Sequence, residues 1–395
     1  MSNGKHFGIL ASGGNCPGID VVVRSFIEQA QDDGNEVYPI HNGLNGLLVK
    51  QQLTAYPLMT RFQLQELFNG HGSKLGCSRD FIGPQHAERA ARTIAEYVEE
   101  YGLETLCVIG GDGSAAGTKH AIDAMDTIGK VQKPGIVLAP KTIDNDLLRT
   151  ERTFGHRTAV ANIAWNLRTI RNDAMSHKRV NLVQVPGREA GWLALRGGKS
   201  GGADYTLIPE QPVPVEEICQ RIVDLYAAQQ HVIVCVGEGF VPEGVEEKDV
   251  KTTDENGNNG RFTPAAYLAG KLNEQMAGQF PHINSEKLPA RAVSIDSEQL
   301  RGLPPTPTDI IFCEEVGATA AHLANEGIRD VAIVRKHGEV DVVPLATIVG
   351  GARGVPEGAY DRQKLRMRDI PGGFDARLQH YKQSLINDES GTLPS

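Results

Sequence analysis

The chain has 395 residues, of which 40% are hydrophobic and 23% charged, and its formal net charge is -9 at pH 7. This is the composition of a globular protein with enough chain for a large core. The negative charge and the absence of a Lys/Arg-dense stripe argue against a nucleic-acid partner. No apolar run approaches the about 18 residues of a membrane span, so we expect no membrane partner. Six scattered cysteines without metal-type spacing indicate reduced thiols and a cytoplasmic protein.

Short strand-like runs alternate with helical patterns along most of the chain. Strands are predicted at residues 6–10, 36–40, 105–109, 135–139, 180–185, 231–236 and 330–334. Helices are predicted at residues 19–30, 87–101, 115–125 and 157–171. This alternation predicts an α/β fold in which a mainly parallel sheet carries helices on both faces. A turn-rich connection is expected at 209–214, an exposed loop at 244–260 and a short helix at 375–386.

A glycine-rich turn follows the first predicted strand. Residues 11–18 read Ala-Ser-Gly-Gly-Asn-Cys-Pro-Gly and lead into a helical pattern. A turn of this kind presents backbone N–H groups and the positive end of the helix dipole to a phosphate. Glycine pairs also serve turns with positive φ, so this segment alone leaves both interpretations open.

Two further segments follow the predicted strands at 105–109 and 135–139. They read Gly-Gly-Asp-Gly-Ser at 110–114 and Pro-Lys-Thr-Ile-Asp-Asn-Asp at 140–146. Glycines and carboxylates at the carboxyl ends of two strands are what a phosphate and Mg²⁺ site requires, since one carboxylate can hold the metal while another accepts a hydroxyl proton. The pattern predicts phosphoryl transfer to a small molecule. Two alternatives assign these residues a purely structural role: Asp112 would cap the following helix, and Asp144 would form an Asx-type turn.

Candidate groups for binding an anionic substrate come later in the chain. Guanidinium groups bind phosphates in bidentate fashion, and arginines stand beside strand-like runs at Arg179, Arg188, Arg291 and Arg301. Glu238 ends another apolar run, where a carboxylate can bind sugar hydroxyls. Each of these residues taken alone also fits an ordinary surface or loop ion pair.

Taken together, these motifs resemble the phosphofructokinase family. Their order and spacing match over about residues 5–350, and Thr-Ile-Asp-Asn-Asp following Gly-Gly-Asp-Gly is the most specific part. The stretch 295–309 is similar to the long-type branch of plants and trypanosomatids. The resemblance implies two similar three-layer lobes with mainly parallel sheets and an active site in the interlobe cleft. It implies a donor-binding lobe of 1–155 plus about 300–355, and a sugar-phosphate-binding lobe of about 156–299 plus 356–395.

The resemblance also implies a role for each motif residue. Asp144 would be the base that deprotonates the sugar 1-hydroxyl, and the other catalytic residues would be Arg188, Thr142 and Asp146. Asp112 would hold Mg²⁺. The phosphoryl donor would contact Gly13, Arg79, Gly111, Asp112, Gly113, Ser114 and Lys141. The sugar phosphate would contact Thr142, Asp144, Arg179, Pro186, Gly187, Arg188, Glu238, Arg291 and Arg301.

The identity of the donor depends on two positions that point in different directions. Gly113 leaves space for the nucleotide of ATP, whereas pyrophosphate-dependent members of the family usually carry Asp there. Lys141 is usual in pyrophosphate-dependent members, although long-type ATP enzymes combine it with the glycine. The resemblance therefore implies ATP with Mg²⁺, and pyrophosphate stays open as the alternative.

The acceptor implied is fructose 6-phosphate, with a related ketose phosphate such as sedoheptulose 7-phosphate as the alternative. Three departures from the family pattern keep that alternative open, namely Pro186, His156-Arg157 and residues 297–299. The counterparts of Arg179 and Arg291 reach into a neighbouring subunit's site, which implies a homo-oligomer, a tetramer or a dimer.

Two alternatives to a sugar-phosphate kinase are a protein without catalytic activity and a kinase of another family. A catalytically silent regulatory subunit is the non-enzyme alternative, although such subunits typically lose the base or the metal carboxylate. NAD kinases and lipid kinases share Gly-Gly-Asp-Gly but lack the Thr-Ile-Asp-Asn-Asp segment and the later arginines.

Overall fold

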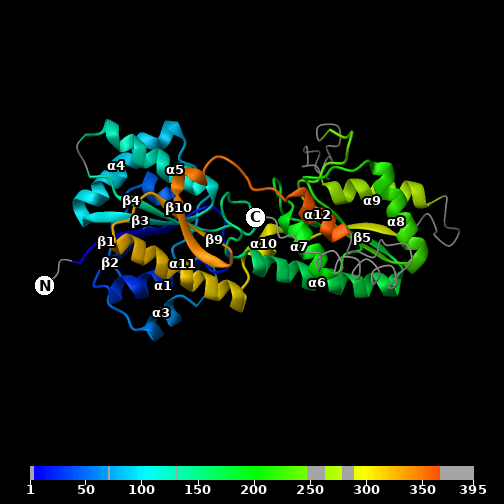
Figure 1. The fold of residues 1–395 in the computed structure, drawn as a ribbon, viewed down its shortest axis with the longest axis horizontal. Helices are drawn as coiled ribbons and strands as arrows, with labels where there is room; N and C mark the ends of the chain where they lie inside the picture. The colour runs from blue at the N-terminus through cyan, green and yellow to red at the C-terminus, as the bar shows by residue number, and fades with distance from the viewer. Residues whose placement is uncertain (1–3, 70–71, 130–131, 247–262, 278–288, 365–395) are drawn as a thin grey trace, which may run out of the picture.

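Two mainly parallel sheets, each covered by helices on both faces, form the two lobes of the molecule (Figure 1). The structure is a computed structural model that describes residues 4–69, 72–129, 132–246, 263–277 and 289–364. The helix expected at 375–386 and most of the loop expected at 244–260 lie outside these residues. None of the described helices combines the length and the apolar character that crossing a bilayer requires.

The first lobe contains a six-stranded sheet with the order β10-β9-β4-β3-β1-β2, parallel except that β10 runs antiparallel to β9. Its strands are β1 (His6–Ala11), β2 (Glu36–Pro39), β3 (Leu103–Gly110), β4 (Gly135–Pro140), β9 (Val331–Lys336) and β10 (Glu339–Pro344). One face is covered by α1 (Ile19–Asp32), α3 (Arg61–Leu67) and α11 (Pro307–Asn325). The other is covered by α2 (Asn45–Leu48), α4 (Pro84–Tyr101) and α5 (Asp112–Ala124).

The second lobe contains a four-stranded parallel sheet with the order β6-β7-β5-β8. Its strands are β5 (Val180–Val185), β6 (Tyr205–Leu207), β7 (Val232–Gly237) and β8 (Ala290–Ser294). The helices α6 (His156–His177) and α7 (Trp192–Gly201) pack on one face, and α8 (Val215–Gln229) and α9 (Pro264–Met276) pack on the other.

Local sequence explains where a helix such as α4 begins and ends. Pro84 occupies its first turn, where a missing N–H costs nothing, and Gly102 ends it in the left-handed conformation with φ of 67°. Buried residues recur three or four positions apart, for example Ala87, Ala90 and Ile94, and form the face that packs on the sheet.

The sequence patterns missed several elements for identifiable reasons. The strand β6 has only three residues. The strand-like run noted at Arg291 is β8, a largely exposed edge strand. The helix α11 is apolar on nearly all sides because it packs closely along α1. A Cβ on its Gly317 would lie 2.5 Å from the carbonyl oxygen of Val22. Helical periodicity is weak in such a buried helix.

The chain passes between the lobes three times within the described residues. It crosses between β4 and α6, between β8 and α11 through the short helix α10 (Ser297–Arg301), and between β10 and α12 (Glu357–Lys364). Figure 1 shows the last crossing as the orange segment that leads to α12 on the second lobe. The division into 1–155 plus about 300–355 and about 156–299 plus 356–395 stays our proposal for the domain boundaries.

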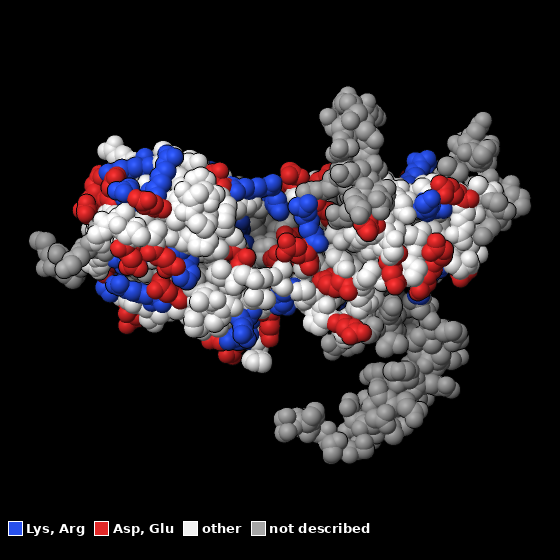
Figure 2. All heavy atoms as spheres, turned by 90° about the horizontal axis from the view of Figure 1, so that it is seen from above, with Lys and Arg blue, Asp and Glu red and all other residues white. Residues whose placement is uncertain are grey.

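The register of the first sheet brings its three motif-bearing loops together. Ala11 pairs with Ile109, and Gly110 pairs with Pro140, so β1, β3 and β4 end at the same edge. This edge faces the second lobe, and Figure 2 shows a hollow between the lobes with basic and acidic side chains on its rim. Parallel strands therefore place glycines and carboxylates from distant parts of the sequence side by side.

Candidate active site

The loop of residues 140–146, here called the carboxylate loop, turns sharply at Asn145. This residue has φ of 57°, a left-handed conformation that Asn tolerates better than most residues. Its side chain supports the turn, because Oδ1 accepts a hydrogen bond from the backbone N–H of Thr153 at 2.9 Å. The side chain that supports this turn is therefore that of Asn145, which lies between Asp144 and Asp146.

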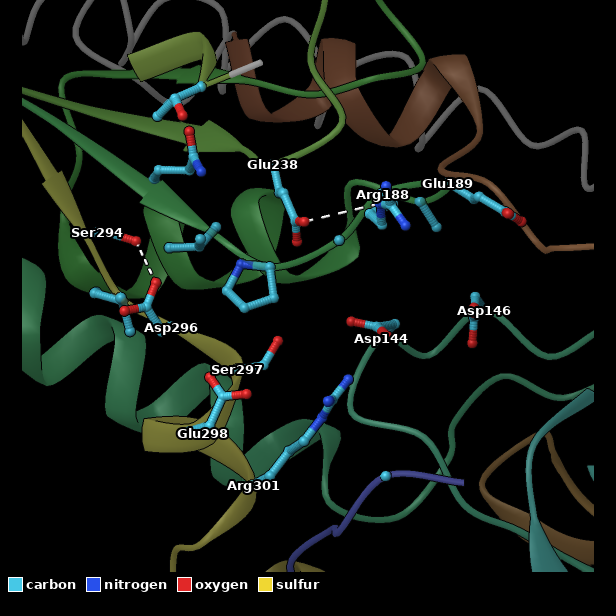
Figure 3. A pocket seen from close by; sticks show the side chains of 18 of the residues that line it. Asp144, Asp146, Arg188, Glu189, Glu238, Ser294, Asp296, Ser297, Glu298 and Arg301 are labelled. Carbon is cyan, nitrogen blue, oxygen red and sulfur yellow. Dashed lines mark hydrogen bonds and ion pairs between the residues drawn. The ribbon is translucent and has the colours of Figure 1, made fainter. Parts of the chain in front are cut away.

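Asp144 points into the space between the lobes (Figure 3). Its Oδ1 atom is buried and has no hydrogen-bond partner within the described part of the chain. Burial, and then the neighbouring charge of Asp146, raises the pKa of Asp144 from 3.8 to about 6, although Arg301 and Lys141 oppose the shift. A carboxylate with a pKa near the working pH suits a general base.

Asp146 and Asp112 are the two carboxylates beside Asp144. Burial raises the pKa of Asp146, a hydrogen bond from Thr142 opposes this shift, and the charge of Asp112 adds to it. Asp112 is the first residue of α5, and Gly111 occupies the capping position, so the helix-cap interpretation of Asp112 is wrong. Its Oδ1 atom instead accepts a hydrogen bond from the backbone N–H of Gly350 at 2.9 Å.

A cavity of about 310 Å³, here called the smaller cavity, lies over the three loops of the first lobe. All the residues predicted to bind the donor line it, namely Gly13, Arg79, Gly111, Asp112, Gly113, Ser114 and Lys141. Lys141 is buried, and its Nζ atom donates to the carbonyl of Gly14 at 2.7 Å. A Cβ on Gly13, which has φ of 83°, would lie 2.9 Å from this amine, whereas a Cβ on Gly113 would meet nothing within 4 Å.

A second cavity of about 690 Å³, here called the larger cavity, opens between the lobes. Most residues predicted to bind the sugar phosphate line it, namely Asp144, Pro186, Gly187, Arg188, Glu238 and Arg301. Arg188 and Glu238 form an ion pair at 3.8 Å on the wall opposite Asp144 (Figure 3). Arg79, Asp144, Asp146 and Arg301 line both cavities, so the two spaces meet at Asp144.

Arg179 and Arg291 do not line either cavity in the single chain. Arg179 precedes β5 and pairs with Asp173 at 3.1 Å. Arg291 is exposed on β8, where it pairs in register with Asn181. Both therefore lie near the amino end of β5, the opposite end from Pro186 and Arg188. Thr142 lines the smaller cavity rather than the larger one.

Comparison with known proteins identifies the family. The family described as Phosphofructokinase matches residues 6–324 of this chain. The "ATP-dependent 6-phosphofructokinase" of Chloroflexus aggregans is 31% identical over 356 residues, which cover 88% of this chain and 92% of that protein. The chain belongs to the phosphofructokinase family.

Similar members of the phosphofructokinase family carry names with different donors. The "Pyrophosphate--fructose 6-phosphate 1-phosphotransferase" of Thermoproteus tenax is 32% identical over 349 residues, covering 88% of this chain and 94% of that protein. Among solved structures, a pyrophosphate-dependent phosphofructokinase from Marinobacter aquaeolei has a TM-score of 0.71 at 22% identity, covering 89% of this chain and 86% of that one. The structural likeness confirms the predicted α/β fold.

The carboxylates of the smaller cavity suit a Mg²⁺ ion that is also coordinated by phosphate oxygens. Within the described ranges, no group of three His, Cys, Asp or Glu side chains could hold a bare metal ion. Mg²⁺ in kinases is commonly bound by one or two carboxylates plus phosphate oxygens. Asp112 and Asp146 both line the smaller cavity, and the charge of Asp112 contributes to the raised pKa of Asp146, so these two carboxylates could be the protein ligands in such a set.

Sequence reasoning missed several residues of the two cavities. Phe81 lines the smaller cavity with about half of its surface exposed, which suits stacking on a flat ring. Its sequence neighbourhood contains no signal for that position. The larger cavity also includes an acidic and hydroxyl-rich wall at one end, formed by Ser294, Asp296, Ser297 and Glu298. The sequence motifs alone do not indicate that these residues form one wall of a cavity.

His156 has a different place from the one expected. His156 departs from the family pattern and was therefore expected near the acceptor. It is instead buried and does not line the larger cavity. Its Nδ1–H group donates to the carbonyl of Ile143 at 2.7 Å, in the middle of the carboxylate loop. Burial lowers the pKa of His156 to about 3, so the ring stays neutral. Through this hydrogen bond, His156 supports the backbone of the carboxylate loop.

Proposed function

We propose that this protein transfers the γ-phosphoryl group of ATP to the 1-hydroxyl of fructose 6-phosphate with Mg²⁺, as a 6-phosphofructokinase. The observation that carries the proposal is that a phosphate-type cavity and a larger interlobe cavity meet at one unpartnered carboxylate, Asp144. The names of the similar family members support the reaction class.

In this proposal the residues act mainly by positioning and by neutralising charge. Asp144 accepts the proton of the acceptor hydroxyl as that oxygen attacks the γ-phosphorus. The bond from this phosphorus to the β–γ bridging oxygen breaks, and ADP is the leaving group in the smaller cavity. Arg188 and Arg301 lie on opposite walls of the larger cavity. Arg188 would steady the transferring group, and Arg301 would bind the phosphate of the sugar. Asp112, with Asp146 beside it, would hold Mg²⁺, which when bound neutralises the phosphate oxygens of the donor.

The open space at Gly113 supports ATP as the donor. A side chain at this position would project into the smaller cavity, and glycine leaves room for the rest of a nucleotide. Phe81 at the same cavity offers an aromatic surface for the base. Pyrophosphate is the alternative, because Lys141 can hold a second phosphate and a similar relative is named for that donor.

The acceptor and the oligomer are proposed together. Arg301 lies on the same short helix as Ser297 and Glu298 and lines the larger cavity, whereas Arg179 and Arg291 do not line the cavities of their own chain. We infer that these two arginines bind the sugar phosphate in a neighbouring subunit, within a homo-oligomer that is a tetramer or a dimer. A longer ketose phosphate such as sedoheptulose 7-phosphate is the alternative acceptor.

A matrix of rates on the purified protein tests the proposal. ATP and pyrophosphate, each with Mg²⁺, are assayed against fructose 6-phosphate and sedoheptulose 7-phosphate. We expect turnover with ATP and fructose 6-phosphate. Turnover with pyrophosphate alone would show that Lys141 outweighs Gly113, and turnover with the longer ketose phosphate alone would reassign the acceptor. The absence of turnover in all four combinations would favour a catalytically inactive regulatory subunit.

The raised pKa of Asp144 predicts a loss of activity in acid. A base must be ionised to accept a proton, so kcat/KM should fall roughly tenfold per pH unit below about pH 6. Sugar phosphates also titrate in this range, so the profile is compared with that of Asp146→Asn. Removing the negative charge of Asp146 lowers the pKa of Asp144, and the acid limb should move to lower pH. Identical acid limbs in the pH profiles of the two proteins would contradict the assignment of Asp144 as the general base.

A further inference from the structure

The segment of residues 348–356, here called the crossover segment, runs from the first lobe to the second and contacts the carboxylate loop on its way. It begins after β10 and leads into α12, and Figure 1 shows it bridging the two lobes. Gly350 donates its backbone N–H to Asp112, and Ala352 forms an isolated antiparallel bridge with Leu147. One short segment thus contacts both the proposed metal carboxylate and the end of the carboxylate loop.

Arg353 makes the most extensive contacts of the crossover segment with the carboxylate loop. Its backbone N–H donates to the carbonyl of Asp146. Its guanidinium donates to the carbonyl of Asn145 at 2.8 Å and to that of Glu151 at 3.3 Å. These bonds hold the peptide groups on the carboxyl side of Asp144, at the residue whose left-handed backbone forms the turn.

The other carbonyls of the turn are held from nearby in the sequence. The hydroxyl of Thr153 donates to the carbonyl of Thr142 at 2.7 Å, and the imidazole of His156 donates to that of Ile143 at 2.7 Å. No hydrogen bond from the described residues holds the Oδ1 atom of Asp144, so the direction of its carboxylate depends on the backbone on either side. Arg353 supports one of those sides, and Thr153 and His156 support the other.

The same arginine is attached to the second lobe. Its guanidinium lies over the ring of Trp192 at 4.5 Å from the centroid, and the indole N–H donates to the carbonyl of Arg353 at 2.8 Å. Val355 then donates its N–H to Glu210 at 2.7 Å, and Glu210 also accepts from the backbone of Gly191 just before α7. Arg353 therefore links the carboxylate loop to the lobe that carries Arg188 and Glu238.

We propose that Arg353 is a positioning residue that orients Asp144 through the backbone of Asn145 and Asp146 and ties this orientation to the second lobe. The proposal rests on the phosphotransferase function proposed above. Arg353 lines neither cavity, so it acts through the loop rather than on a substrate. Displacing a reacting group by about 1 Å can cost about 10²-fold in rate, which sets the scale of the expected effect.

The chain offers a matched control in Arg196. Its guanidinium also lies over the Trp192 ring, at 4.8 Å, but no hydrogen bond joins it to the carboxylate loop within the described residues. The experiment compares Arg353→Ala, Arg353→Lys and Arg196→Ala in the full-length protein. The quantities measured are kcat, the KM for each substrate and the melting temperature.

We expect Arg353→Ala to lower kcat roughly 10- to 100-fold, with the KM values of both substrates changed less than about threefold, while Arg196→Ala keeps kcat within about threefold of the wild type. Equal losses of kcat in the two alanine variants, or an unchanged kcat in Arg353→Ala, would overturn the proposal. If Arg353→Ala does not fold, Arg353→Lys decides by the same criteria. Both carbonyls accept from the Nη2 atom of a planar guanidinium that stacks on Trp192, and an ammonium on a flexible stem is not held in that position.

The wild-type protein in the same assay separates the two claims. A wild type without turnover in any of the four substrate combinations would overturn the proposed function, and the positioning role would fall with it. A wild type that turns over while Arg353→Ala and Arg353→Lys both keep its kcat would overturn the positioning role alone.

Discussion

Replacing Asp144 by Ser should lower kcat by about 10³-fold or more while the protein stays folded, because a positioned general base contributes about 10²- to 10⁴-fold to such a reaction. The loss should appear in kcat with little change in the KM for ATP, since we propose that the glycine-rich loops and Lys141 bind most of the donor. Steady-state kinetics of the purified variant measure this effect. Asp144→Ser at the wild-type rate would refute the assignment of the base.

The stability of the same variant provides an independent readout. Burial raises the pKa of Asp144 in the folded protein, so between about pH 4 and pH 6 the folded state holds a proton that the unfolded chain has lost. Stability due to this group therefore falls as the pH rises through that window, and the full penalty is present above it. At pH 8 we expect Asp144→Ser to be at least as stable as the wild type in urea unfolding.

Glu189→Gln is the matched control for Asp144→Ser. Glu189 lines the same cavity, but it is exposed and lies outside the carboxylate loop. Its substitution removes one negative charge from the cavity without removing the base. We expect kcat within about threefold of the wild type, whereas a general electrostatic role for the cavity carboxylates would lower kcat in both variants.

Gly113→Asp should block the use of ATP, with a loss of about 10³-fold in kcat/KM for this donor, because like-charge contacts cost several kcal/mol and about 1.4 kcal/mol corresponds to tenfold. The new carboxylate would project into the smaller cavity next to Asp112 and would meet both the nucleotide and the phosphate charge. A Cβ at this position meets nothing within 4 Å, so the fold should tolerate the change.

Gly113→Ala separates the effect of charge and size from that of losing the glycine. The methyl group has free space, and Gly113 is in neither a positive-φ conformation nor a close contact. This variant should therefore keep ATP turnover close to that of the wild type. If Gly113→Asp retains ATP turnover, the donor does not pass over this loop, and the argument for ATP from Gly113 is lost.

The chemistry of the candidate site could be predicted from local sequence because it resides in short segments. Apart from Arg79, which lies in the loop before α4, each predicted donor residue follows a strand that the apolar runs predicted, and parallel strands end at a common edge. Side-chain type and spacing were enough to predict the three loops that line the smaller cavity, and their binding roles stay our proposal. The family that these motifs resemble is confirmed over residues 6–324.

Contacts between distant parts of the chain could not be predicted in the same way. The bonds from Gly350 to Asp112 and from Arg353 to Asn145 join residues more than 200 positions apart. They use backbone groups, which leave no pattern of side-chain types in the sequence. Arg179 and Arg291 show the converse case, because their residue type suited a phosphate while their strand position placed them outside the cavities of their own chain.

By itself, the amino-acid sequence determined the fold class, the three phosphate and carboxylate loops and the kind of chemistry they support, because periodicity and local turn residues encode these features. Only the tertiary structure decided how the loops are supported and which walls close the larger cavity. Part of that support comes from the third crossing between the lobes, and the path of a crossing depends on the packing of whole sheets and helices rather than on any local pattern.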